Sequence, residues 1–188
     1  MLKVGQKAPD FTLSAHDQNS VTLSEYEGEK NVVLSFHIFS FTGGWTDQVS
    51  LFRSHNAKFE EKDTQVLGIS NDARPSQSAY ATSLGNLPYP LLSDFHPKGS
   101  VTQAYDIWNQ ERGTSQRAVY IIDKEGIIRF AKTYDTAADL DPRDILTELD
   151  AIWRTTMLSA SGWWKTIILH WEYSGRLVRI LEFKIWLS

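Results

Sequence analysis

Two apolar runs, residues 31–39 and 65–70, most constrain the fold of this chain. Each run has the length and composition of one buried β-strand. The residues between them predict a helix from Thr46, because four apolar residues follow at helical spacing: Val49, Leu51, Phe52 and Phe59. Two strands joined through a crossover helix pair in parallel within one sheet. The sequence therefore predicts a βαβ unit and an α/β fold.

Further short elements surround this unit. The predicted elements are a β-hairpin of residues 11–13 and 21–23, a helix from Pro75 to Leu84, an extended piece at 89–92, a short helix at 99–105, a second hairpin of 118–122 and 127–131, and a closing helix at 142–153. Their order is β-α-β-α, then a hairpin, then a helix. This order predicts a central mixed β-sheet with helices on both faces, which is the thioredoxin-like arrangement.

Composition narrows the classes of function. A net charge of −4 over 188 residues gives no electrostatic reason to expect nucleic-acid binding. No stretch reaches the roughly 18 apolar residues of a membrane span, and the first residues lack the apolar core of a signal peptide. A cytoplasmic protein that binds no membrane is therefore expected. The chain has no cysteine, which excludes disulfides and thiolate metal sites, and its histidines show no metal-ligand spacing. Neither a metal nor a cofactor is expected.

A change in composition near residue 155 predicts a boundary. Residues 1–154 carry 15 Lys/Arg and 21 Asp/Glu, a net charge of −6, whereas residues 155–188 carry 4 and 2, a net charge of +2. Four of the seven tryptophans lie in this last segment: Trp163, Trp164, Trp171 and Trp186. We therefore expect one domain over residues 1–154, a length that suits a single core, and a Trp-rich basic C-terminal extension over residues 155–188 outside that fold.

The segment after the first buried run carries the most specific motif, with Ile38, Thr42 and Trp45 at fixed spacing. It resembles the Pro-x-x-x-Thr-x-x-Cys loop of the peroxiredoxins, the alkyl hydroperoxide reductase/thiol-specific antioxidant family. Ile38 stands for the proline, Thr42 matches the threonine, and Trp45 stands at the position of the peroxidatic cysteine or selenocysteine. Further blocks in family order carry the same resemblance: residues 4–13, 31–36, 68–72, 89–94 and 117–123.

The resemblance implies thiol- or selenol-dependent reduction of hydrogen peroxide and organic hydroperoxides. In the family, the thiolate lies in the first turn of a helix, where free N–H groups favour negative charge. A threonine, matched here by Thr42, hydrogen-bonds the peroxide, and an arginine, matched here by Arg117, lowers the pKa of the thiol. Because the chain holds no resolving cysteine, an active form would be of the one-Cys type, with an external thiol as reductant, and a homodimer is expected. An indole offers no nucleophile, so Trp45 predicts that the chain as written is inactive.

The other candidate side chains have structural interpretations as well. Thr42 also fits a loop threonine that forms a turn bond, and Arg117 also fits a surface arginine. The surrounding family blocks favour a role in the site for both. His37 lies on a buried strand and is predicted to be a hydrogen-bonded core histidine. Asp94 and His96 could face the mouth of a pocket, but a role in a turn is favoured.

Three interpretations of Trp45 remain open. In the first, a UGA codon is read as tryptophan, because some peroxiredoxin-like proteins carry selenocysteine, which UGA encodes, after Thr-Gly-Gly. The same reading of a UGA stop codon at Trp163 or Trp164 would append the C-terminal extension. In the second, the chain is a non-catalytic binding scaffold on a peroxiredoxin fold. In the third, Trp45 is an engineered substitution.

The extension itself has an alternative interpretation as an amphipathic helix. Its apolar face would consist of Ile167, Ile168, Trp171, Leu177, Val178 and Leu181. Such a helix would dock on the domain or on a dimer partner. A helix on a membrane surface is less favoured, because basic and acidic residues are mixed along the segment.

Overall fold

The computed structural model describes residues 1–42 and 45–160, with the backbone alone for residues 45–47 and 156–160. The strands are β1 (Thr12–Ala15), β2 (Ser20–Thr22), β3 (Asn31–Phe36), β4 (Thr64–Ser70), β5 (Leu91–Ser93), β6 (Trp108–Asn109), β7 (Thr114–Ser115), β8 (Ala118–Ile122) and β9 (Ile128–Thr133). The helices are α1 (Trp45–Glu60), α2 (Arg74–Ser83), α3 (Ser100–Ala104) and α4 (Pro142–Ala160), with 3-10 turns η1 (Leu23–Tyr26) and η2 (Ala137–Asp139).

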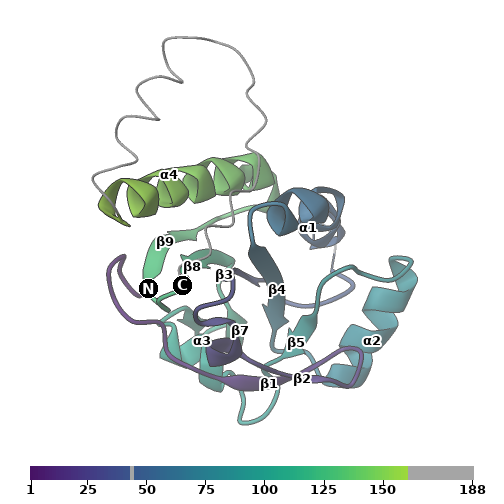
Figure 1. Cartoon of the computed structure of the whole chain (residues 1–188). Helices are drawn as coiled ribbons and strands as arrows, with labels where there is room; N and C mark the ends of the chain where they lie inside the picture. Colours follow the sequence, from purple (N-terminus) through teal and green to yellow (C-terminus); the bar gives the residue numbers. More distant parts are fainter. Residues whose placement is uncertain (43–44, 161–188) are drawn as a thin grey trace. The chain divides into compact units, whose positions relative to one another are not determined.

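Seven strands form one mixed sheet in the order β2-β1-β5-β4-β3-β8-β9 (Figure 1). β3 pairs in parallel with β4, and β4 pairs in parallel with β5, whereas the other neighbours are antiparallel. The helix between β3 and β4 is α1, so the predicted βαβ unit is confirmed. Both predicted hairpins are also confirmed, as β1–β2 and β8–β9.

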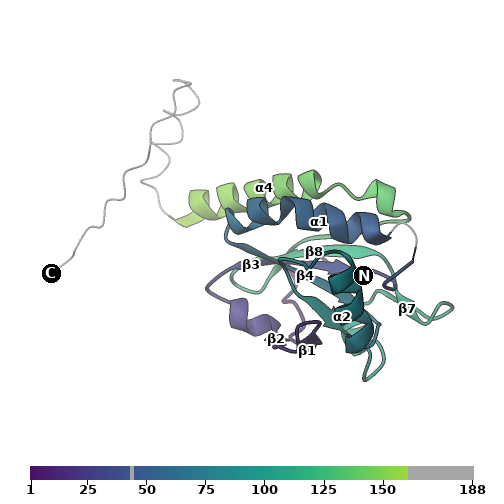
Figure 2. The same cartoon turned by 90° about the vertical axis from the view of Figure 1, so that its right-hand side faces the viewer.

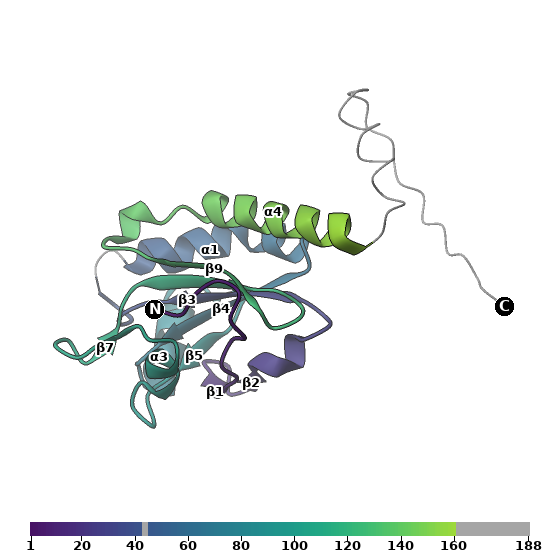
Figure 3. The ribbon, with the colours of Figure 1, turned by 90° about the vertical axis from the view of Figure 1, so that its left-hand side faces the viewer.

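Each face of the sheet buries its own apolar cluster. On one face the cluster combines strand residues with residues of α1, α2 and α4, among them Phe52, Tyr80 and Ile145. On the other face it includes Leu23 of η1 and Val101 of α3. Figure 2 shows α1 and α4 on one side of the strands, and Figure 3 shows α3 on the opposite side. A central mixed sheet with helices on both faces, as in the thioredoxin-like fold, is therefore confirmed.

The structure differs from the sequence predictions at three places. β3 ends at Phe36, whereas a strand to Phe39 was predicted, because the next residues leave the sheet in a loop that is held by other partners. The short hairpin β6–β7 was not predicted, since strands of two residues carry no recognisable period. α4 continues to Ala160 beyond the predicted end at Trp153.

The compact unit that contains the sheet extends from Met1 to Ile152. The predicted extension at 155–188 begins inside α4 as described, and its residues 161–188, including the expected amphipathic helix, lie outside the described residues. The boundary at residue 155 therefore stays a prediction. Among the helices of residues 1–42 and 45–160, none is both long and apolar enough to cross a membrane.

A chain shortened to residues 1–160 is expected to unfold cooperatively, like the full chain. The buried apolar residues of α4 that contact the sheet are Ile145, Leu146 and Leu149, and all three remain in the shortened chain. Thermal unfolding followed by circular dichroism checks this expectation, with a midpoint within a few degrees of the full chain. A broad, non-cooperative transition would mean that residues 161–188 belong to the domain core.

Candidate active site

The loop from β3 to α1 lies at the carboxyl end of β3 and is anchored by side chains from distant segments. The backbone N–H of Ser40 donates to Asp72 Oδ2 at 2.7 Å. The hydroxyls of Thr114 and Ser115 donate to the carbonyls of Ile38 at 3.0 Å and of His37 at 2.9 Å. The sequence alone could not indicate these anchors, because 32 to 78 residues separate the partners.

Trp45 is the first residue of α1. The first N–H groups of a helix have no partner within the helix, and together with the helix dipole they favour negative charge at this end. Position 45 is therefore placed where a thiolate or selenolate would be stabilised. The side chain of Trp45 lies outside the described part of the structure.

Thr42 lies exposed on the same loop, and its hydroxyl donates to the carbonyl of Phe39 at 2.8 Å. This hydrogen bond agrees with the alternative interpretation of Thr42 as a loop threonine that forms a turn bond. The hydroxyl oxygen can still accept a second hydrogen bond. A role for Thr42 toward a peroxide therefore stays a prediction.

Arg117 is buried, with 7% of its surface exposed, so the alternative of a surface arginine is wrong. It directly precedes β8, and the register that pairs Phe36 with Ala118 places Arg117 next to the end of β3 from which the loop leaves. Its Nη1 donates to the carbonyl of Asp135 at 2.5 Å and to that of Tyr134 at 3.4 Å. Burial lowers the pKa of the Arg117 guanidinium, while Asp139 opposes this effect. The cation is thus held by carbonyl oxygens beside the loop.

His37 is 1% exposed, which confirms the prediction of a core histidine. Among the described residues its Nε2 has no hydrogen-bond partner, so the predicted hydrogen bond is not found at that atom. Burial lowers the pKa of His37 to about 4, although Asp72 acts in the opposite direction. The imidazole is therefore neutral at pH 7.

This burial predicts a pH dependence of stability. The pKa of His37 is about 4 in the folded chain against the ordinary 6.5, so its contribution is complete above pH 6.5 and is lost as the pH falls toward 4. The difference corresponds to about 3 kcal/mol. Urea unfolding at several pH values, compared with His37→Gln, checks the prediction. The parent should lose about 3 kcal/mol more than the variant between pH 7 and pH 4, and equal losses would contradict it.

Sequence reasoning missed Ser35 and Gln48, which are both buried near this loop. Gln48 Nε2 donates to Ser35 Oγ at 2.8 Å and thereby ties the first turns of α1 to β3. The available signal was a serine within the apolar run of β3, since a buried hydroxyl needs a partner.

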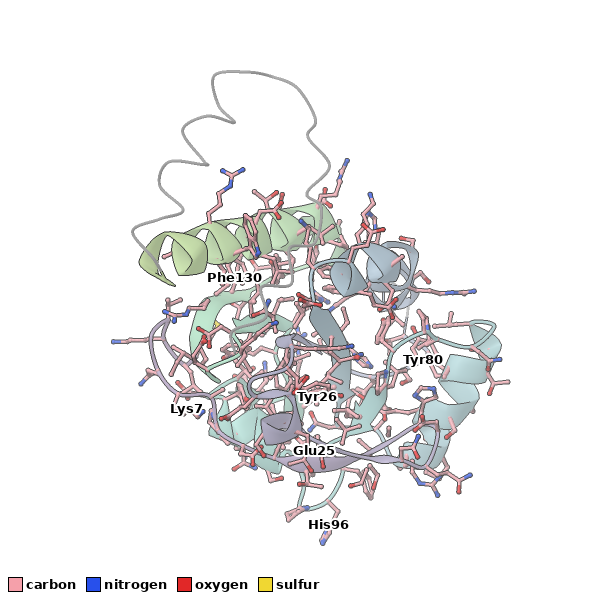
Figure 4. The ribbon with its side chains drawn as sticks, viewed as in Figure 1. Lys7, Glu25, Tyr26, Tyr80, His96 and Phe130 are labelled. Carbon is pink, nitrogen blue, oxygen red and sulfur yellow. The ribbon has the colours of Figure 1, made fainter. Side chains whose placement is uncertain are left out.

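Sequence reasoning also missed Phe41, which lies in the same loop. It is 61% exposed, adopts a positive φ of 61°, and its ring contacts Tyr80 at 5.1 Å between centroids. Figure 4 shows Tyr80 on the α2 side of the domain.

Asp94 and His96 lie in the segment between β5 and α3, not in the loop from β3 to α1. Asp94 is fully buried, and its carboxylate accepts the backbone N–H groups of Val101 and Thr102 at the start of α3, which supports the turn role. His96 is exposed on the outer loop (Figure 4) and borders a cavity of about 260 Å³ together with Phe11 and Tyr105. Within the described residues, no group of three His, Asp or Glu side chains could hold a metal ion.

Comparison with known proteins identifies the family of this fold and loop. The sequence model of the AhpC/TSA family matches residues 4–131. The chain belongs to the AhpC/TSA family. Alkyl hydroperoxide reductase E of Mycobacterium bovis is 42% identical over 154 residues, which cover 80% of this chain and all of that protein. The chloroplastic 2-cysteine peroxiredoxin of Chattonella marina var. antiqua is 36% identical over 160 residues, 80% of each protein.

Solved structures agree with this assignment. The peroxidoxin BcpB of Mycobacterium tuberculosis superposes with a TM-score of 0.74 at 26% identity and covers 81% of this chain and 99% of that one. AhpC of Enterococcus faecalis, at 22% identity and a TM-score of 0.77, supports the fold alone, over 86% of this chain and 98% of that one. The predicted resemblance to peroxiredoxins, a family of peroxidases, is therefore confirmed.

Proposed function

We propose that this chain is the scaffold of a one-Cys-type antioxidant peroxidase whose nucleophile position is occupied by Trp45. The activity of that scaffold is thiol- or selenol-dependent reduction of hydrogen peroxide and organic hydroperoxides. The names of relatives, an alkyl hydroperoxide reductase and a 2-cysteine peroxiredoxin, support this substrate class. The lack of any cysteine that could resolve an intermediate supports the one-Cys type. We further propose a cytoplasmic homodimer that uses an external thiol and no cofactor.

The observation that carries the proposal is the place of residue 45 at the start of α1. The loop before it carries Thr42 and leaves β3 next to buried Arg117. A thiolate or selenolate at this place would attack one peroxide oxygen. The O–O bond would break, and the other oxygen would leave as water or an alcohol after it takes up a proton. The resulting sulfenic or selenenic acid would be reduced by the external thiol.

The chain as written is expected to have no peroxidase activity. Attack on the O–O bond requires a nucleophile, and the sequence provides neither a thiol nor a selenol. Hydrogen peroxide consumption with a dithiol reductant, after treatment with a chelator, should equal the rate in buffer. Turnover above that rate that survives the chelator would contradict the proposed role of position 45.

A binding scaffold without catalysis is the second candidate. The hydroxyl of Thr42 forms a turn bond, and the ring of Phe41 is presented to solvent on the same loop, two observations that a binding role accommodates. Codon 45 of the gene separates the candidates. UGA supports a selenol enzyme whose sequence was read with tryptophan, and UGG supports a scaffold or an engineered chain.

A further inference from the structure

Three buried side chains in or next to the loop between β3 and α1 carry polar atoms without a hydrogen-bond partner among the described residues. These atoms are His37 Nε2, Ser40 Oγ and Gln48 Oε1. His37 directly follows β3, Ser40 lies in the loop and Gln48 lies in α1, and the three residues are 1%, 7% and 1% exposed. A buried polar group without a partner loses its hydration without compensation. Three such atoms around one loop therefore indicate a shared partner.

Other contacts bring the three side chains into one layer. Gln48 is bonded to Ser35. His37 lies two residues later and still donates its backbone N–H to the carbonyl of Ile69 in β4, so its side chain lies on the same face as that of Ser35. The backbone N–H of Ser40 donates to Asp72 Oδ2, and the same carboxylate acts electrostatically on the His37 imidazole. Ser35 and Asp72 thus connect the helix, the strand and the loop.

The chemistry of these atoms defines the partner. It must donate to the amide oxygen of Gln48 and must bond to a hydroxyl and to an imidazole nitrogen that donates or accepts according to its tautomer. An anion would be repelled by that amide oxygen and by the carboxylate of Asp72. A cation would be repelled by the guanidinium of Arg117, which lies next to the end of β3. A small neutral molecule with O–H donors and lone pairs meets all three requirements. It also suits either orientation of the amide.

We propose that an internal water molecule binds between His37, Ser40 and Gln48 and links the loop to α1. Buried waters of this kind form about three hydrogen bonds to polar groups that the protein leaves unsatisfied. The water would couple the loop that carries Thr42 to the helix that begins at position 45. The inference concerns the folded chain and does not depend on peroxidase activity.

Nuclear magnetic resonance on the full chain tests the site directly. Magnetisation transfer from a long-lived water to the ring protons of His37 is expected, and it should be lost in Ser40→Ala. Because this measurement uses the parent chain, it does not depend on the folding of a variant. A His37 ring without contact to a long-lived water would overturn the proposal.

A double-mutant cycle tests the link itself. Ser40 Oγ and Gln48 Oε1 do not bond to each other among the described residues, so no direct hydrogen bond couples Ser40→Ala to Gln48→Leu, whereas a shared water would couple them. We expect the combined effect on the unfolding equilibrium constant to differ from the product of the single effects by about fivefold or more. Ser54→Ala, on the exposed side of α1, serves as control partner for Ser40→Ala, with a deviation below about twofold. A cycle of Ser40 and Gln48 as additive as this control would also overturn the proposal.

Discussion

Trp45→Cys is expected to turn the chain into a peroxidase that reduces hydrogen peroxide and is itself reduced again by an external thiol. The new thiol would occupy the first residue of α1, where the helix terminus stabilises a thiolate. Its pKa should therefore fall below the ordinary value of about 8.5. We expect the rate of thiol oxidation to exceed that of free cysteine by about three orders of magnitude. Stopped-flow measurement of thiol loss against peroxide concentration gives this rate.

Arg117→Ala in the Trp45→Cys background should remove about two of these orders, because one buried cation or donor contributes about this much to a reaction that develops negative charge. Arg143→Ala is the matched control, since Arg143 is an exposed arginine of α4 paired with Asp141. It should leave the rate unchanged. A thiol no faster than free cysteine, or one indifferent to Arg117, would favour the binding scaffold instead.

Asp94→Ala should produce the largest loss of stability among the substitutions considered. The buried carboxylate accepts the N–H of Val101 at 3.1 Å, the N–H of Thr102 at 2.8 Å and the hydroxyl of Thr102 at 2.7 Å. Alanine would leave these donors unsatisfied at the start of α3. We expect the free energy of unfolding to fall by about 4 kcal/mol, a large fraction of the 5–15 kcal/mol that is typical of a domain. Urea unfolding measures the change.

Two controls separate this effect from a general loss of charge. Asp94→Asn keeps one acceptor oxygen and should lose roughly half as much. Asp17→Ala removes an exposed carboxylate that accepts the N–H of Asn19 in the turn before β2, and the loss should stay below about 1 kcal/mol. An Asp94→Ala protein as stable as Asp17→Ala would show that the donors of α3 find other partners.

The sheet could be predicted from the sequence because its strands are continuous apolar runs separated by recognisable helices and turns. The end of β3 could not. Ile38 and Phe39 continue the apolar run, but tertiary hydrogen bonds to Thr114 and Asp72 draw the chain out of the sheet. An apolar pattern indicates that side chains are buried, but it does not distinguish a strand from a loop. The side chains of Ile38 and Phe39 are half-buried although they lie in a loop.

The candidate site could be predicted only as far as the family motif extends. The family resemblance predicted Thr42, position 45 and Arg117, and their catalytic roles stay predictions; the burial of Arg117 shows only that it is not a surface arginine. The contact between Ser35 and Gln48 was not predictable, because the two residues belong to β3 and α1, whose packing no local pattern encodes. The same limit applies to Asp94, which resembles a turn residue in sequence and is fully buried in the structure.

The strand order has a consequence for synthesis of the chain on the ribosome. β3 is complete before residue 45, but both of its neighbours, β4 and β8, are encoded after that residue. A nascent chain released at codon 45 would contain β1, β2 and β3, and β3 would have neither strand to pair with. Such a fragment could not form the sheet. If codon 45 is UGA, its decoding as an amino acid and not as a stop decides whether a domain is made at all, before the inserted residue decides what chemistry that domain performs.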